Sequence, residues 1–314
     1  MKYFARLIEE LQNLVKIHRA GDTLTPPALL KSLQIDGRRV SYLHMGLDKS
    51  GPAVLLVHGF GGFFMDWPRV MVPLSKRAPV YALDLPGWGF SEPRDHAEGL
   101  EDDVAIIAEF IRQNNLEEVI LVGISYGAAV AWASAAQGIS KVKRVVLLNP
   151  MPPHPLRHLK SLLYRLIFFV NRFEFTARWS SRFLTKSQYK WVCKENLKNY
   201  RLLDSLYLEV GFFVLRQPFI YRNLHSHAKK AFSINWEAWA GKLRDIQIPV
   251  TIMQGLDDKV FTMASARYLH SLIPHAELIE VKDCGHAMVF DQHKKITATL
   301  IHSLRKEALK ITET

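Results

Sequence analysis

Short apolar runs rich in valine, isoleucine and leucine alternate with stretches of helical periodicity along most of this 314-residue chain. The clearest runs are AVLLVHG at 53–59, EEVILVGIS at 117–125, VKRVVLLNP at 142–150 and PVTIMQG at 249–255. In these runs apolar residues do not alternate with polar ones, as they would in a strand that has one face in water. Strands that are apolar on both faces are typical of a parallel sheet covered by helices on both sides. The sequence therefore predicts an α/β fold.

The intervening pieces fit the same architecture. APVYALDLPG at 78–87 and AELIEVK at 276–282 add two strands, and helical periodicity covers about 100–114, 126–137, 264–272 and 294–311. A further strand pattern, RRVSYLHMG, is separated from AVLLVHG by the turn-rich LDKSGP. This arrangement predicts a hairpin between these two strands.

The middle of the chain, 151–247, has a different character. It opens on NPMPPHP at 149–155, where prolines exclude regular structure, and after that it reads as helical. It contains 18 of the 34 aromatic residues and 17 lysines and arginines against 6 acidic residues, an excess equal to the whole formal net charge of +11. Its longest apolar run, LIFFV, is too short to span a bilayer. We predict a core made of 25–150 and 248–314 and a helical insertion at 151–247.

The first 24 residues predict a separate element. Apolar residues recur there at helical spacing, and charged residues interrupt the continuous apolar core that a secretory signal needs. Residues 1–24 are therefore expected to form an amphipathic helix that packs on the domain or on a partner chain. An interfacial membrane anchor is the alternative.

Only two cysteines occur, Cys193 and Cys284. They cannot form a disulfide framework, and no cluster of cysteine and histidine has the spacing of a zinc site. We expect a reducing, cytoplasmic location, with peripheral membrane association left open, and no structural metal.

A serine between two glycines marks the candidate active site. Gly123, Ser125 and Gly127 form a Gly-x-Ser-x-Gly pattern between a strand and a helix, where a tight turn presents the serine outward. A serine nucleophile needs a base that is oriented by a third group. Asp257 and Asp258 follow one later strand and His286 follows another.

With these motifs, the chain resembles the α/β-hydrolases. GLDD at 255–258 matches the family's Gly-x-x-Asp, and DCGH at 283–286 matches its histidine motif except at Cys284. HGFGG at 58–62 and DLPGWGFSEP at 84–93 match segments after the third and fourth strands. The resemblance covers about 33–310 apart from the insertion, which occupies the place of the family's cap.

The resemblance implies a catalytic triad in the family order, Ser125, Asp258 and His286. It also implies an oxyanion hole formed by the backbone amides of Phe60 and Tyr126, and it requires no cofactor. Asp257 is an alternative acid that family spacing disfavours. Asp283 is expected to face solvent or to cap the loop, and Asn149 occupies the position after the sixth strand where some relatives carry the acid. His58 is expected to brace the oxyanion turn, and Cys284 is not expected to be a nucleophile.

These expectations favour a serine hydrolase that cleaves a carboxylic ester with an apolar acyl part, as a carboxylesterase or a lipase-like enzyme does. A carbon-carbon bond hydrolase of the same fold and a non-catalytic binding protein are the alternatives. Epoxide hydrolase chemistry is disfavoured because those relatives carry aspartate in place of Ser125. The aromatic residues of the insertion either line an apolar pocket or form the insertion's own core: Phe168, Phe169, Phe173, Trp179, Trp191, Phe212, Phe213 and Trp236.

The positive charge of the insertion suggests which partners the protein could bind. The basic insertion, or the N-terminal helix, would bind an anionic membrane surface, or the basic residues would simply form a solvated face. Nucleic-acid binding is not expected because no recognised binding motif accompanies the charge.

Overall fold

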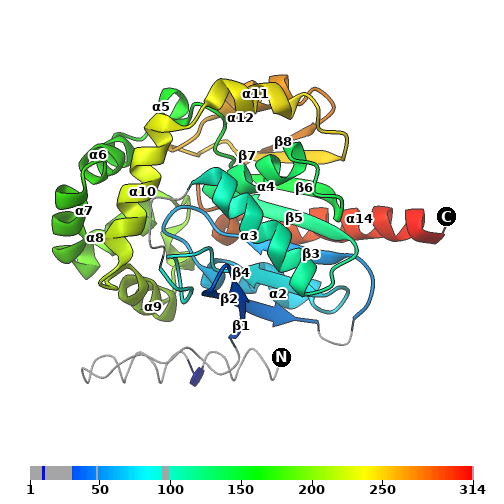
Figure 1. Ribbon diagram of the computed structural model, residues 1–314, viewed down its shortest axis with the longest axis horizontal. Helices are drawn as coiled ribbons and strands as arrows, with labels where there is room; N and C mark the ends of the chain where they lie inside the picture. Colours follow the sequence, from blue (N-terminus) through cyan, green and yellow to red (C-terminus); the bar gives the residue numbers. More distant parts are fainter. Residues whose placement is uncertain (1–8, 11–29, 47–48, 94–98, 313–314) are drawn as a thin grey trace.

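The computed structural model describes residues 9–10, 30–46, 49–93 and 99–312. Eight strands form one sheet in the order β1-β2-β4-β3-β5-β6-β7-β8, and all neighbours from β4 to β8 are parallel. The predicted α/β fold is confirmed (Figure 1). The amphipathic helix predicted at 1–24 lies outside the described residues apart from Glu9 and Glu10.

The predicted hairpin is wrong. Strand β2 (Arg38–Met45) pairs with β1 (Lys31–Ile35) and with β4 (Val80–Leu83), both antiparallel, and β4 separates it from β3 (Ala53–Val57). The true hairpin joins β1 to β2 through Asp36 and Gly37, which have φ of 50° and 74°. An Asp-Gly pair with both φ values positive is a favoured two-residue hairpin turn.

The inner strands of the sheet are buried on both faces. In β3 the side chains of Ala53, Leu55 and Val57 belong to one hydrophobic cluster, and those of Val54 and Leu56 belong to another. Helices α3 (Leu100–Gln113), α4 (Tyr126–Ala136) and α12 (Met263–Leu272) contribute to the first cluster. Helices α2 (Pro68–Leu74) and α14 (His293–Thr312) contribute to the second. The sequence lacks alternation because both faces are covered.

Helix α4, which follows the glycine-flanked serine, is buried along ten of its eleven residues, from Tyr126 to Ala135. Its small alanine side chains allow it to lie against the sheet between β5 (Val119–Ile124) and β6 (Val142–Leu148). A helix that is apolar on all sides is a buried core helix. The start of α4 is therefore held firmly at the centre of the sheet.

Between β6 and β7 (Val250–Gly255) the chain forms a group of helices that we call the cap helices, α5 to α11. Figure 1 shows α6, α7 and α8 stacked along the edge of the molecule away from the C-terminus. No helix in the described part of the chain is long and apolar enough to cross a lipid bilayer. The bounds are α5 Pro155–His158, α6 Leu162–Asn171, α7 Glu174–Arg182, α8 Lys186–Glu195, α9 Ser205–Leu215, α10 Ile220–Ser233 and α11 Trp236–Leu243.

Candidate active site

Ser125 lies on the tight turn between β5 and α4 and has φ 55° and ψ −114°. Its Oγ lies 2.9 Å from Nε2 of His286, and the Nδ1 of that ring lies 2.9 Å from Oδ2 of Asp258. His286 and Asp258 follow β8 (Glu277–Val281) and β7. The carboxyl ends of three parallel strands thus bring three residues into one hydrogen-bonded chain, although 161 positions separate Ser125 from His286.

Asp258 is buried and held by more than the histidine. Its Oδ1 accepts the backbone N–H groups of Val260 and Phe261 at 2.7 and 3.1 Å, and its Oδ2 accepts from the Gln254 side chain at 3.2 Å. Asp257, the alternative acid, instead forms a surface ion pair with Lys198 at 2.7 Å. The two adjacent carboxylates therefore face different partners, and only Asp258 contacts the imidazole.

Asn149, which directly follows β6, connects the two loops that carry the acid and the histidine. Its Oδ1 accepts the Gly255 N–H at 2.7 Å, and its Nδ2 donates to the carbonyls of Gly285 and His286, both at 2.8 Å. The side chain is fully buried. In the sequence, Asn149 is notable only because it stands where some relatives carry the acid. Asn149 joins these two loops only because the ends of three strands meet in the folded sheet. No local sequence pattern predicts such a contact.

The glycines around Ser125 are required by close approach. A Cβ on Gly127 would lie 2.2 Å from the Val57 carbonyl oxygen, and one on Gly123 would lie 2.0 Å from the Gly127 oxygen. A Cβ on Gly59 would lie 3.1 Å from the Cβ of Ser125. These contacts place the loop after β3 directly against the serine.

This contact also brings the two predicted oxyanion-hole residues next to the serine. Phe60 follows Gly59 on the loop, and Tyr126 is the first residue of α4. The amino end of a helix carries a partial positive charge that favours an anion beside it. The Tyr126 phenol points away from this chemistry, because its hydroxyl donates to Asp103 at 2.5 Å.

His58 braces the loop. Its Nε2 accepts the Leu85 N–H at 3.0 Å, so the other ring nitrogen, Nδ1, carries the proton and donates to the Gly59 carbonyl at 2.8 Å. Complete burial lowers the pKa of His58 to about 4, which keeps the ring neutral. Nearby, Asp84 accepts the backbone N–H groups of Phe64 and Phe90, and its burial raises its pKa to about 8.

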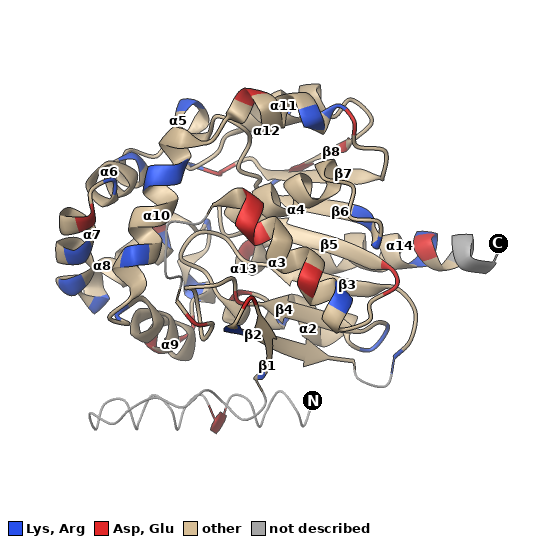
Figure 2. Ribbon diagram, viewed as in Figure 1, with Lys and Arg blue, Asp and Glu red and all other residues tan. Residues whose placement is uncertain are grey.

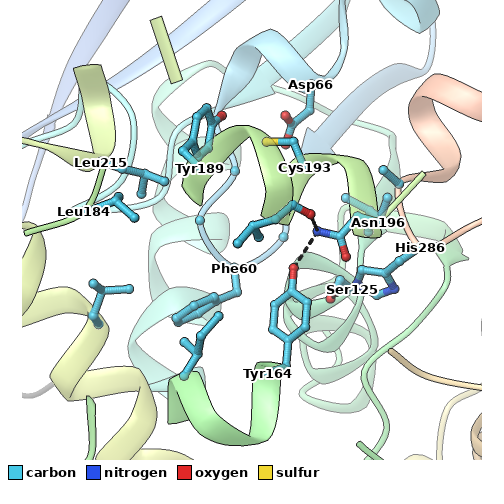
Figure 3. Close-up of a pocket in the computed structure, with 18 of the residues that line it drawn as sticks. Phe60, Asp66, Ser125, Tyr164, Leu184, Tyr189, Cys193, Asn196, Leu215 and His286 are labelled. Atoms are coloured by element: carbon cyan, nitrogen blue, oxygen red, sulfur yellow. Dashed lines mark hydrogen bonds between the residues drawn. The ribbon is translucent and has the colours of Figure 1, made fainter. Parts of the chain in front are cut away.

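Two cavities meet at Ser125. The larger has a volume of about 280 Å³ and a lining of mostly apolar residues from the core and from α6, α7, α8 and α9. Figure 3 shows Ser125 and His286 on one side of it and Leu184 and Leu215 on the opposite side. The smaller, about 40 Å³, lies beyond Phe60. A serine at the junction of two cavities can act on a bond that joins two parts of one molecule.

The eight phenylalanine and tryptophan residues of the insertion that were candidates for an apolar pocket do not line the larger cavity, whereas three of its tyrosines, Tyr164, Tyr189 and Tyr207, do. Phe168 and Trp236 line the smaller one, Phe213 belongs to the buried core, and Phe169, Phe173, Trp179 and Trp191 are exposed. Tyr164 of α6, which the sequence analysis did not single out, lines both cavities and accepts a hydrogen bond from Asn196 at 2.7 Å (Figure 3).

One wall of the larger cavity is polar. The Asp66 carboxyl is buried there and accepts a hydrogen bond from the Tyr207 hydroxyl at 2.8 Å, with Tyr189 and Cys193 close by (Figure 3). Burial raises the pKa of Asp66 to about 7. This group could not be recognised from the sequence, because nothing in the FFMDW stretch at 63–67 marks its aspartate as buried.

Cys284, beside the histidine motif, is completely buried. Burial raises the pKa of its thiol above the ordinary value, so the thiolate form that would act as a nucleophile is suppressed. This agrees with the expectation that Cys284 is not the nucleophile.

The sequence matches the family model described as the alpha/beta hydrolase fold over residues 52–292. The chain belongs to this family. The match extends from β3 through the loops that carry Asp258 and His286, so the resemblance identified in the sequence is confirmed at the level of the family and its fold.

Similar proteins differ in activity. The chain is 26% identical over 269 residues to 2-hydroxy-6-oxo-2,4-heptadienoate hydrolase of Pseudomonas putida, covering 78% of this chain and 86% of that one. It is 25% identical over 309 residues to bifunctional epoxide hydrolase 2 of Sus scrofa, covering 87% of this chain and 54% of that one. It spans only 31% of the length of another curated relative.

Among solved structures, a bacterial membrane phospholipase A superposes with a TM-score of 0.73 at 22% identity, covering 96% of this chain and 92% of that one. This similarity establishes the shared fold. It does not choose among the activities that the fold supports.

Proposed function

We propose that this protein is a serine hydrolase that cleaves a carboxylic ester. The observation that carries the proposal is the hydrogen-bonded chain from Ser125 through His286 to Asp258, with 2.9 Å at both links. A non-catalytic binding protein would not need Ser125, His286 and Asp258 to be aligned by hydrogen bonds at a cavity, so this alignment argues against that alternative. Ser125 occupies the place where, by the family resemblance, epoxide hydrolases carry aspartate, which argues against that activity here.

The reaction would proceed in two halves. His286 Nε2 takes the Ser125 proton while Oγ attacks the carbonyl carbon, and the backbone amides of Phe60 and Tyr126 stabilise the oxyanion. Asp258 holds the ring with Nδ1 protonated. The tetrahedral intermediate collapses when His286 gives its proton to the leaving alcohol oxygen. A water then attacks the acyl-enzyme carbonyl, losing a proton to His286, and His286 returns that proton to the Ser125 Oγ as the acid leaves.

The larger cavity favours an ester with an apolar acyl part over the diketone-type substrate of a carbon-carbon bond hydrolase. The compound named for the Pseudomonas putida relative is a carboxylate. Among the described residues that line the larger cavity there is no lysine or arginine, and the one acidic residue is Asp66. An anionic group would lose its hydration there without a counter-charge. An apolar acyl chain would gain from the same surroundings, and the alcohol part would occupy the smaller cavity.

Fluorophosphonate labelling of the wild type and of Ser125→Ala tests the nucleophile. We expect label on the wild type alone, and an unlabelled wild type would exclude a serine hydrolase. Nitrophenyl esters of increasing acyl length should then give rising kcat/KM until the cavity is filled. Equal rates at all lengths would contradict the apolar acyl site, and a higher kcat/KM for 2-hydroxy-6-oxo-2,4-heptadienoate would favour the carbon-carbon alternative.

The two adjacent aspartates provide a matched pair of variants. Asp258→Asn should lower kcat by up to about 10⁴-fold, because the histidine loses the partner that orients it. Asp257→Asn removes one surface ion pair and should leave kcat within a factor of about two, since exposed pairs contribute little. Similar losses in both variants would refute the assignment of the acid.

A further inference from the structure

The outer side of the cap helices exposes an unusual number of large apolar side chains. Eight of the eleven large hydrophobic side chains exposed in the described part of the chain lie between residues 162 and 191. Leu162, Leu166 and Phe169 recur at helical spacing on α6, and Phe175 and Trp179 on α7 are 80% and 60% exposed. A merely solvated helix face would carry polar residues at these positions.

Cations are interleaved with these apolar groups. Residues 162–195, which we call the outer cap segment, contain seven lysines and arginines and two glutamates. Figure 2 shows the basic residues recurring on α6, α7 and α8. Arg172 lies over the rings of Phe173 and Phe232 at 5.9 and 4.7 Å. On α8, Lys186, Lys190 and Lys194 repeat every four residues and are all exposed.

This combination selects one kind of partner. Aromatic side chains with flanking lysine and arginine are typical of surfaces that lie in the interface of an anionic bilayer. Protein interfaces are depleted in lysine at their centres. A second copy of this chain would bring two cationic faces together in a symmetric dimer, and like charges disfavour that contact.

The same helices separate the larger cavity from the outside. Ile167 of α6, Ser180 of α7 and Val192 of α8 line the cavity, while the exposed apolar side chains lie on other sides of these helices. We propose that the outer cap segment docks on an anionic lipid bilayer, with its aromatic side chains at the headgroup level. Docking would hold the wall of the cavity against the membrane, where apolar esters are concentrated. The docking itself does not depend on the proposed ester hydrolysis.

The tryptophans allow a direct test. Of the seven, Trp179 and Trp191 are 60% and 51% exposed, and the other five are buried. With the full chain carrying Ser125→Ala, we expect co-sedimentation with phosphatidylcholine vesicles containing 30% phosphatidylserine at least about tenfold stronger than with pure phosphatidylcholine. Binding should weaken in 1 M NaCl, where the Debye length falls to about 3 Å. Brominated lipids should quench the tryptophan fluorescence.

Matched variants locate the contact. Arg178→Glu with Arg182→Glu should reduce binding to anionic vesicles at least about tenfold, since each basic group near the surface contributes about 1 kcal/mol. Lys76→Glu with Arg77→Glu makes the same charge change at exposed positions after α2 and should preserve binding. Phe175→Ser with Trp179→Ser should lower binding and quenching, while Leu256→Ser, at another exposed apolar side chain, should change neither.

Three outcomes would overturn the proposal: no preference for anionic vesicles, no quenching, or equal losses in the cap variants and their controls. The third outcome would assign the binding to another part of the chain. The same substitutions in the chain with Ser125 intact should leave fluorophosphonate labelling and turnover of a water-soluble short ester unchanged. That readout shows that the variants are folded and separates a failure of docking from a failure of the proposed catalysis.

Discussion

Replacing Ser125 by glycine should abolish activity and stabilise the protein relative to alanine at the same position. The backbone at Ser125, with φ 55° and ψ −114°, is in a region that a residue with a Cβ enters only under strain. Such strain costs about 1–3 kcal/mol. Glycine relieves it but costs about 0.4–1 kcal/mol through the greater freedom of the unfolded chain. We expect Ser125→Gly to exceed Ser125→Ala in unfolding free energy by about 0.5–2 kcal/mol.

The glycine and alanine variants both lack the hydroxyl, so the lost hydrogen bond to His286 cancels between them. Guanidinium unfolding at equal m-values measures the difference, and fluorophosphonate labelling should fail for both variants. Ala105, exposed within helix α3, is the control, because Ala105→Gly should lower stability by about 0.5–1 kcal/mol. If Ser125→Gly were less stable than Ser125→Ala by a similar amount, the strain argument would be refuted.

Three more predictions concern groups that the site holds in place. Asn149→Asp keeps an acceptor for the Gly255 N–H but loses both donated hydrogen bonds, so kcat should fall about 10²-fold with a smaller change in KM; unchanged kcat would contradict its positioning role. Burial raises the pKa of Asp66 to about 7, so the native state holds this proton more tightly than the unfolded state. Stability should therefore fall as pH rises from about 4 to 7, by at most about 1.4 kcal/mol per pH unit for this group. Asp66→Asn should remove that part of the slope, and parallel pH profiles would contradict the assignment. Burial raises the pKa of Cys193 to about 12 and that of Cys284 as well, so iodoacetamide should modify both thiols only after denaturation; rapid alkylation of the native protein would be the contrary result.

Local sequence patterns were sufficient for the main elements of the core. The periodicity placed helices at about 100–114 and 126–137, and the structure has them at Leu100–Gln113 and Tyr126–Ala136. Burial on both faces of a strand and on all sides of α4 produces a pattern within a few neighbouring residues. Such patterns can be recognised without knowledge of the rest of the chain.

Pairing between distant segments could not be obtained in this way. The stretch LDKSGP suggested that β2 and β3 are neighbours, yet β4 enters from later in the chain and pairs with both. A turn-rich linker shows that the chain can reverse there. It does not show which strand occupies the adjacent position, because that depends on the path of the whole chain.

The candidate site, too, has features that the sequence predicts and features that depend on the folded structure. The order of residue types along the chain was enough to single out Ser125, His286 and an aspartate at 257 or 258, because strand ends in a parallel sheet converge on one edge. The family resemblance favoured Asp258. The orientation of Asp258 rather than Asp257 toward His286 depends on the folded loop, as do the bracket formed by Asn149 and the buried carboxyl of Asp66. The same holds for the cap helices. The sequence shows how many aromatic residues they contain, but which of these are exposed depends on which side of each helix packs on the core. Residue identity determines the chemistry that is available, and only the packing of segments far apart in the chain determines which groups meet and which face solvent.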